Sequence, residues 1–152
     1  MFFKNKYLTN NPAFGEMKYI ISGWEKTLLI DFNFLGDKRK VRVWAVASSR
    51  KEMVTKQQEM AYISFLENVE EKEKIVEDVL KREFPELTED ELKKRFSFNM
   101  ICFSRNGDCG ICIDDAEAEI WDIDPTSGFA IAFTPEVQFF DTEDEYMAWH
   151  FS

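Results

Sequence analysis

The sequence predicts an α+β fold: a mainly antiparallel β-sheet, a central block of two to three helices packed on one face, and a short C-terminal helix. Three observations predict it. The only long helical periodicity lies at about residues 55–96, segments of strand character lie on both sides of it, and a helix-start signal recurs at Thr142. Strands that come before and after a helical block favour an antiparallel sheet with helices on one face.

Length and composition set the outer limits. The 152 residues are expected to form a single domain, residues 1–152, with residues 1–16 as an irregular lead-in. Fifteen Phe and four Trp supply a core, which excludes a disordered chain. No apolar run has the length of a membrane span, the start lacks the pattern of a signal peptide, and three cysteines indicate a reducing compartment. A cytoplasmic protein is therefore expected.

The segment before the helical block has the pattern of strands. Residues 17–22 are expected to form one strand, and residues 26–34 and 38–47 a hairpin whose turn is Gly36-Asp37. In the second arm, apolar residues at 41, 43 and 45 alternate with Arg42, Trp44 and Val46. One face of this arm should therefore be apolar and the other amphipathic.

Each expected helix start joins a capping residue to Glu or Gln three residues later. These pairs are Thr55 with Gln58, Asn68 with Glu71, and Thr88 with Glu91. Pro85 cannot continue a helix and disfavours the helical conformation at Phe84, so the second helix should end there. One amphipathic stripe with a bend near Asn68 is expected to pack on the sheet.

Strand character returns after the helices. Asn106-Gly107 favours a tight hairpin turn, because both residues tolerate positive φ. The expected strands are residues 97–104, 109–113, 116–123, 129–133 and 137–140. A short helix beginning after Thr142 would place Tyr146, Trp149 and His150 on one side.

Charge is distributed unevenly along the chain. Residues 1–56 have a net charge of +6, residues 57–96 of −5 and residues 97–152 of −11, which together make the net charge of −10. A C-terminal third this acidic should repel nucleic acid and attract a basic protein. A surface that simply keeps the protein soluble would give the same pattern.

The densest acidic segment, at residues 114–124, is the candidate partner-binding surface. Its proposed contact residues are Asp115, Glu117, Glu119, Trp121, Asp122 and Asp124, with Trp121 as the aromatic anchor. Two further interpretations of this acidic segment compete with partner binding, and the first of them stays open. Paired carboxylates could serve a small hydrolase. A calcium loop starting at Asp122 is disfavoured, since Thr126 and Ser127 stand where a ligand and a glycine are expected.

Cys109-Gly110-Ile111-Cys112 matches a C-x-x-C motif, but it follows a turn and enters a strand instead of opening a helix. Cys102, Cys109, Cys112 and His150 could supply a zinc site. A regular hairpin register would put Cys112 on the opposite face from Cys102 and Cys109, so buried, inert thiols are favoured. Neither a P-loop nor a dinucleotide-binding glycine pattern occurs, so no cofactor is expected and an enzyme is not favoured.

Three segments resemble uncharacterised bacterial domains of the kind associated with immunity proteins of polymorphic toxin systems. They are the hairpin led by Trp24, the helix Gln58-x-x-Ala61-Tyr62-x-x-Phe65, and the segment from residues 109–115 to Gly128-Phe129-Ala130-Ile131. The resemblance covers about residues 17–141. It implies an α+β binding module that contacts or neutralises another protein, and it transfers no catalytic residue.

The leading hypothesis is therefore a cytoplasmic protein-interaction module, of the immunity type, whose acidic C-terminal sheet region binds a basic protein. The alternatives are the small hydrolase and a self-associating protein. In the second case, the basic N-terminal region of one copy would meet the acidic C-terminal region of another in a homodimer.

Overall fold

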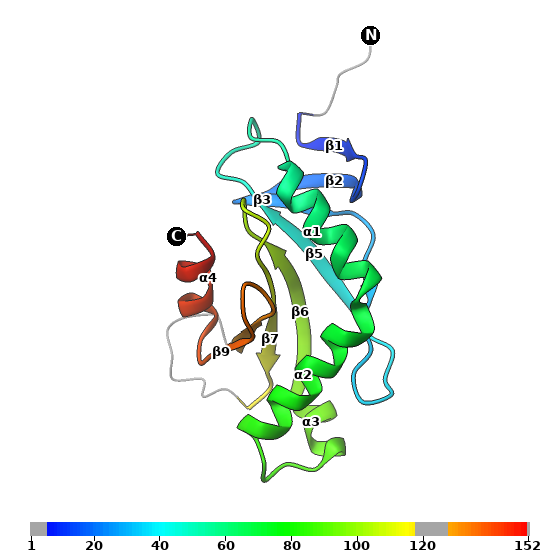
Figure 1. Ribbon diagram of the computed structural model, residues 1–152, viewed down its shortest axis with the longest axis vertical. Helices are drawn as coiled ribbons and strands as arrows, with labels where there is room; N and C mark the ends of the chain where they lie inside the picture. The colour runs from blue at the N-terminus through cyan, green and yellow to red at the C-terminus, as the bar shows by residue number, and fades with distance from the viewer. Residues whose placement is uncertain (1–5, 118–127, 152) are drawn as a thin grey trace.

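The computed structural model describes residues 6–117 and 128–151, and these residues form the predicted α+β fold (Figure 1). Their nine strands form one sheet in the order β1-β2-β3-β5-β6-β7-β8-β9, with β4 also paired to β5. The strands are β1 (Leu8–Asn11), β2 (Gly15–Ile20), β3 (Gly23–Lys26), β4 (Ile30–Asp31), β5 (Lys40–Val46), β6 (Phe96–Phe103), β7 (Cys109–Asp115), β8 (Gly128–Ala132) and β9 (Gln138–Phe140).

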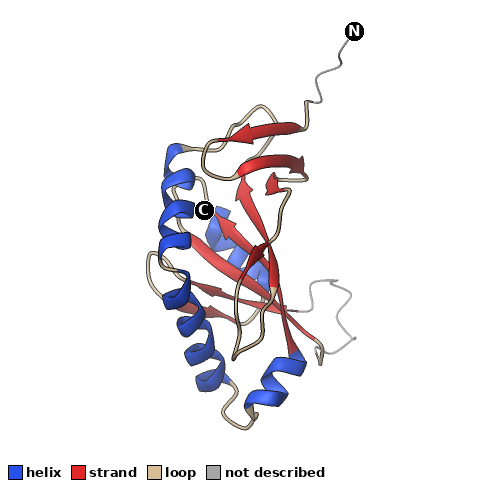
Figure 2. Ribbon diagram, turned by 90° about the vertical axis from the view of Figure 1, so that its right-hand side faces the viewer, coloured by secondary structure: helices blue, strands red, loops and turns tan. Residues whose placement is uncertain are grey.

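Within this described sheet, the β5–β6 pair is parallel and the other neighbours are antiparallel. A parallel pair needs a long crossover connection. The helical block supplies it as α1 (Lys56–Glu67), α2 (Val69–Glu83) and α3 (Glu89–Arg95). Figure 2 shows α1 and α2 lying along one side of the strands.

The predicted helix boundaries are largely confirmed. Thr55 and Thr88 both form complete capping boxes, with Gln58 and Glu91 respectively. The bend falls at Asn68, but the expected cap there is wrong: the Asn68 side chain donates back to the Ser64 carbonyl and does not cap α2. The second helix ends before Phe84, as the following proline requires.

The face of the sheet under α1–α3, called here the first face, holds the larger core. Its aromatic rings pack in series: Phe14 stacks on Tyr62 with ring centroids 4.3 Å apart, and Phe103 meets Tyr62 edge-on at 5.8 Å. Gln58 is fully buried here, and its amide donates to the carbonyls of Val46 and Phe103 at 3.0 Å each. The start of α1 is thereby tied to the ends of the parallel strands.

The opposite face, called here the second face, is covered in part by the terminal helix α4 (Glu143–Phe151), which contacts β8 and β9. The predicted terminal helix is thus confirmed, and the Tyr146 side chain is buried. A smaller core lies here, made of Trp44, Val46, Cys102, Cys112, Ala130, Ala132, Phe140 and Tyr146, with Met100 and Met147 packed against it.

Several strand predictions need correction. In the described part of the predicted lead-in, residues 6–16, the chain is not irregular, because β1 and β2 form a hairpin whose turn is fixed by Asn11 Oδ1, which accepts from the amides of Ala13 and Phe14. The first arm of the predicted hairpin at residues 26–34 contributes only the two residues of β4, and β3 pairs with the rest of β5. Its turn is Leu35-Gly36, not Gly36-Asp37, since these two residues have positive φ.

The hairpin between β6 and β7 has a different register from the one predicted. Ser104 pairs with Asp108 across a three-residue loop, in which Gly107 has φ +94°. This shifts the partner strand by one residue and moves its side chains to the other face. The strand predicted at residues 116–123 does not begin at Ala116, because β7 ends at Asp115 and a turn follows; its remainder, 118–123, lies outside the described residues.

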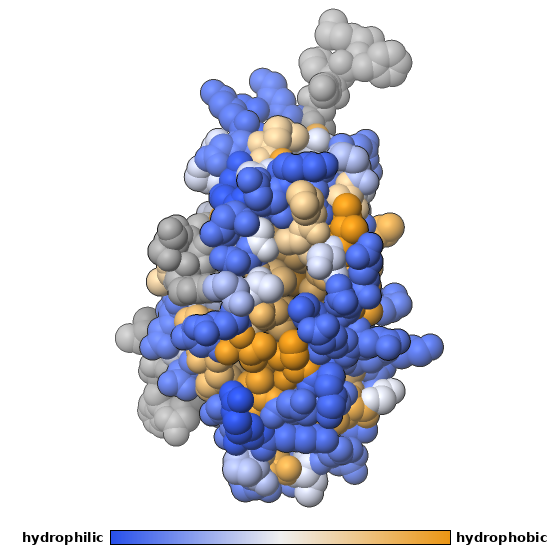
Figure 3. All heavy atoms as spheres, viewed as in Figure 1, coloured by the Kyte–Doolittle hydropathy of each residue, from blue (hydrophilic) through white to orange (hydrophobic). Residues whose placement is uncertain are grey.

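Among the helices of the described residues, none combines the length and apolar composition that a membrane span requires. Seen from the side of α1 and α2, the surface is mostly hydrophilic, with a hydrophobic area beside α2 (Figure 3).

Candidate binding site

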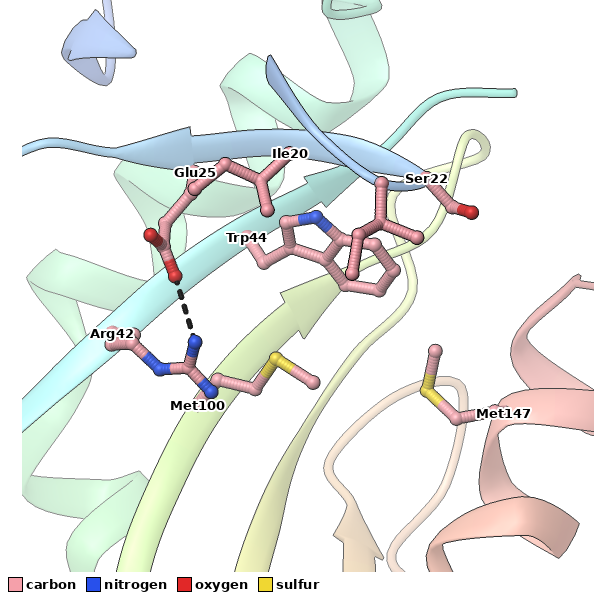
Figure 4. Close-up of a pocket in the computed structure, with 8 residues that line it drawn as sticks. Ile20, Ser22, Glu25, Arg42, Trp44, Met100 and Met147 are labelled. Carbon is pink, nitrogen blue, oxygen red and sulfur yellow. Dashed lines mark hydrogen bonds and ion pairs between the residues drawn. The ribbon is translucent and has the colours of Figure 1, made fainter. Parts of the chain in front are cut away.

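A hollow of about 350 Å³ opens on the second face, in the part of the sheet that α4 leaves uncovered (Figure 4). The residues around it come from β2, β3, β5, β6 and α4, and most of their side chains are apolar. They are Ile20, Ile21, Ser22, Glu25, Arg42, Trp44, Met100 and Met147. Strands far apart in the sequence thus meet at one site.

Strand register explains why these side chains gather. Lys18, Glu25, Trp44 and Cys102 are directly opposite one another on four neighbouring strands, so they share one face of the sheet. In Figure 4 the Trp44 indole lies at the centre, with Met100 below it and Met147 on the far side, on α4. The amphipathic face predicted for residues 38–47 is therefore the floor of the hollow.

The indole of Trp44 lies against the backbone of β3 at Gly23, which has no side chain. A Cβ added at Gly23 would be 2.2 Å from Trp44 Nε1 and 2.7 Å from the carbonyl oxygen of Ala45. No L-side chain fits such a space. The glycine thus leaves room for the ring, which is 9% exposed and forms the apolar floor.

One ion pair marks the polar rim. Arg42 Nη1 donates to Glu25 Oε1 at 3.1 Å, and Arg42 Nη2 donates to Asn99 Oδ1. The Arg42 side chain is 46% exposed, so the pair contributes little to stability, roughly 0–1 kcal/mol. The pair places the Arg42 guanidinium and the Glu25 carboxylate at the edge of the apolar surface.

The turn between β2 and β3 is strained and displays apolar side chains. Ile21 has φ +57°, which a β-branched residue rarely adopts, and its side chain is 87% exposed. Ile20 beside it is 37% exposed. Neither burial nor backbone preference accounts for an isoleucine here, and residues held in such conformations gather at functional sites.

The α4 residue that lines the hollow is Met147, and the first turn of α4 is acidic. Asp144 stands one helical turn before Met147, which brings the two onto neighbouring positions of the helix surface. Glu143 and Glu145 complete an acidic first turn. Glu143 is buried, so the exposed carboxylates of this turn are those of Asp144 and Glu145.

Two residues of the predicted acidic surface are described, and both interact with Arg95. Asp115 accepts two hydrogen bonds from the Arg95 guanidinium, at 2.9 and 3.1 Å, and Glu117 lies 3.4 Å from it. The guanidinium also lies over the rings of Phe84 and Phe96. Asp115 thus links α3 to β7. Glu119, Trp121, Asp122 and Asp124 lie outside the described residues.

The predicted placement of the cysteines is wrong. With the shifted hairpin register, Cys109 belongs to the first-face core, whereas Cys102 and Cys112 lie together on the second face. The three thiols therefore do not converge as one zinc site would need. All three cysteines are free. The side chain of His150 is outside the described set.

No group of three or more His, Cys, Asp or Glu that could hold a metal occurs within residues 6–117 and 128–151. A second hollow of about 260 Å³ lies between α1, α2 and the β6–β7 turn, and Cys109 and Thr134 line it. Burial raises the pKa of the Cys109 thiol, which keeps it protonated and poorly nucleophilic. Among the described carboxylates, Glu25 lines the first hollow and is paired with Arg42, and Asp108 lines the second.

Sequence reasoning did not single out Ile20, Ile21, Arg42, Met100 or Met147 as site residues. One signal was present: an Ile-Ile pair stands directly before Ser22-Gly23, where turn residues are expected. The approach of α4 to β5 and β6 depends on long-range packing and left no local signal.

Comparisons with protein-family models, with curated proteins and with solved structures find no match to this chain.

Proposed function

We propose that this chain is a protein-interaction module, of the kind that the resemblance to toxin-immunity domains implies, and that it binds a basic partner protein on the second face of its sheet. The observation that carries the proposal is the apolar hollow around Trp44, with the strained and exposed Ile21 at its edge. We place the module in the cytoplasm, since its three cysteines are free.

The character of the hollow favours a protein side chain as its occupant. A volume of about 350 Å³ is at the lower limit for a drug-sized ligand and suits one or two large apolar side chains. Trp44 offers a broad aromatic surface, and flexible methionines adapt to the shape of what they contact. Interfaces characteristically place such apolar anchors within a polar rim, and Arg42 with Glu25 supplies that rim.

Charge indicates the partner's sign. The net charge is −10, and α4, which contributes Met147 to the hollow, has two exposed carboxylates in its first turn, Asp144 and Glu145. A basic protein would be steered toward this side, and its association rate would fall as salt is added. The acidic segment that contains Asp115 and Glu117 extends the same field along the chain.

The test compares aspartate substitutions at two exposed apolar residues, Ile21 and Leu28. Ile21→Asp changes the rim of the hollow, whereas Leu28→Asp changes a residue that is 70% exposed in the β3–β4 loop. Affinity capture at low salt from the organism's own lysate would identify a basic protein, and titration of the purified pair would measure the dissociation constant. We expect Ile21→Asp to weaken binding about tenfold or more, and Leu28→Asp to change it less than twofold.

Equal losses in the two variants, or capture of no basic protein by the unchanged chain, would contradict the proposal. The charge component has its own variant: Glu117→Lys with Glu119→Lys should slow association at low salt while the fold is retained. An association rate that stays the same at low and high salt would remove the steering argument.

Self-association is the second candidate, favoured by one observation. The second face has a step, because α4 with its acidic first turn stands beside an uncovered half that carries Lys18 and Arg42. Two such faces can pack about a two-fold axis, each acidic turn over the other copy's basic residues. Salt-sensitive dimerisation, abolished by Ile21→Asp, would identify this case.

A further inference from the structure

The smaller core on the second face gathers four sulfur-bearing side chains. Cys102 and Cys112 are fully buried there, and Met100 and Met147 pack against it while also lining the hollow. Thiolate and thioether sulfur atoms are soft ligands, which select soft metal ions such as Cu(I). The two thiols are buried, whereas Met100 and Met147 are shared with the hollow that the proposed function uses.

The register brings the sulfur atoms close together. Met100 is the direct cross-strand partner of Cys112, and Cys102 faces Gly110, two residues along the same strand. The two cysteines are therefore diagonal neighbours on one face, and both belong to the same buried cluster. The C-x-x-C motif of the sequence is thus split between the faces, and the sheet forms a different pair of cysteines.

We propose that Cys102 and Cys112, with the Met100 thioether as a third donor and Met147 above them, form a site for one Cu(I) ion. On binding, both thiols lose their protons to solvent and two copper–sulfur bonds form. No electron is transferred, and the bound group carries one negative charge. Met100 and Met147 line both the thiol cluster and the hollow, so the ion can enter from the open side.

The surroundings favour a soft ion of low coordination number over zinc. Structural zinc takes four nitrogen or sulfur ligands, and within the described residues no third His, Cys, Asp or Glu joins these two cysteines. The Arg42 charge acts favourably on a Cys102 thiolate, while Glu143 on α4 opposes it. The neighbouring Cys112 thiol, followed by burial, raises the pKa of Cys102 well above its usual value, so the metal must displace a bound proton.

The third cysteine provides an internal control, because Cys109 lies on the other face. The full chain is reduced and titrated anaerobically with Cu(I) against a chromophoric chelator, and native mass spectrometry then weighs the product. We expect one copper per chain, with a mass gain of one copper atom less one hydrogen atom, as an ion of charge +1 gives; the release of two protons is followed separately with a pH indicator. Cys109→Ser should bind as the unchanged chain does, whereas Cys102→Ser and Cys112→Ser should lose about 100-fold or more in affinity.

A fold control keeps the result decisive. Met100→Leu preserves size and hydrophobicity, so circular dichroism should stay native while copper affinity falls roughly tenfold. The proposal is overturned if Cys109→Ser weakens binding as much as Cys112→Ser, or if Met100→Leu leaves the affinity unchanged. It is also overturned if copper binds without release of two protons.

Discussion

The two faces of the sheet are closed to very different degrees. On the first face, α1–α3 bury a continuous aromatic core in which Phe14, Phe65 and Phe103 are at most 1% exposed. On the second face, α4 covers β8 and β9, and the half around Trp44 keeps a hollow and an exposed apolar turn. The difference indicates that the first face supplies most of the stability; recognition by the second face is the proposal made above.

Topology accounts for this asymmetry. The parallel β5–β6 pair requires a long crossover, and a crossover packs its helices on one face of the sheet. Its 12-residue and 15-residue helices therefore lie together on that side. The second face relies on the 9-residue α4, which is too short to cover eight neighbouring strands. An uncovered half is the geometric result.

The largest effect is expected on the first face. Phe65→Ala removes a ring whose centroid lies 6.1 Å from those of Phe103 and Phe133 and 6.2 Å from that of Phe32. We expect the free energy of unfolding to fall by about 3–5 kcal/mol in denaturant titrations. Ile63→Ala, on the exposed side of α1, is the control and should change it by less than about 0.5 kcal/mol. Similar losses in both variants would contradict the assignment of stability to this face.

A smaller effect is expected in the covered half of the second face. A Cβ added by Gly110→Ala would lie 2.5 Å from Tyr146 Oη and 2.7 Å from the Ile131 carbonyl oxygen. Overpacking of this kind should lower the free energy of unfolding by about 1–3 kcal/mol. Adding Tyr146→Phe removes the nearer clash and should recover part of the loss. A double variant no more stable than Gly110→Ala alone would show that the Tyr146 hydroxyl of α4 does not pack against Gly110 of β7.

The capping box of α3 tests how firmly the helical cover of the first face is held. Thr88→Ala removes the hydroxyl that accepts from the Glu91 amide, at a cost of about 1 kcal/mol. Hydrogen bonds from the Thr88 amide and hydroxyl lower the pKa of Glu91, so this stabilisation is present above the carboxyl's ordinary pKa and is lost as pH falls through the lowered one.

Nuclear magnetic resonance titration of Glu91 gives the direct measurement for that variant. Its pKa should move part of the way up toward the ordinary glutamate value in Thr88→Ala, because the hydroxyl bond is lost while the backbone amide of residue 88 can still donate. A pKa that does not move would mean that the Thr88 hydroxyl does not stabilise the carboxylate.

The fold could be predicted from the sequence wherever the signal is local. Capping boxes at Thr55 and Thr88 and the stop before Pro85 depend on neighbours a few residues away, and they appear as expected. The β6–β7 register could not be predicted in this way. The Asn106-Gly107 pair favours a two-residue turn, but Ser104 and Asn106 side chains bond within the loop and Gly107 contacts Gln57 of α1, so a three-residue loop forms.

That one-residue shift also decided the candidate site. It moved Cys102 and Cys112 onto one face and separated both from Cys109, which changes the chemistry available there. The acidic surface was predicted from composition, yet Asp115 is held by Arg95 from α3, a pairing across 20 positions that charge counting does not reveal. The hollow around Trp44 arises from five separate elements, so it exists only at the level of tertiary packing.

The substitution expected to change stability least, Ile21→Gly, should change partner binding strongly. Ile21→Gly places the residue that tolerates positive φ at φ +57°, which removes backbone strain from a side chain that is 87% exposed and adds little to the core. Because glycine also gives the unfolded chain more freedom, the net change should lie within about 1 kcal/mol and favour the folded state. Partner affinity should nevertheless fall about tenfold, since an apolar anchor is lost from the rim. Denaturant titration and binding to the captured basic protein measure the two quantities on the same variant. If the variant is more stable and binds equally well, the strain at Ile21 has no function, and the distinction between a stabilising and a binding face fails at the residue that defines it most sharply.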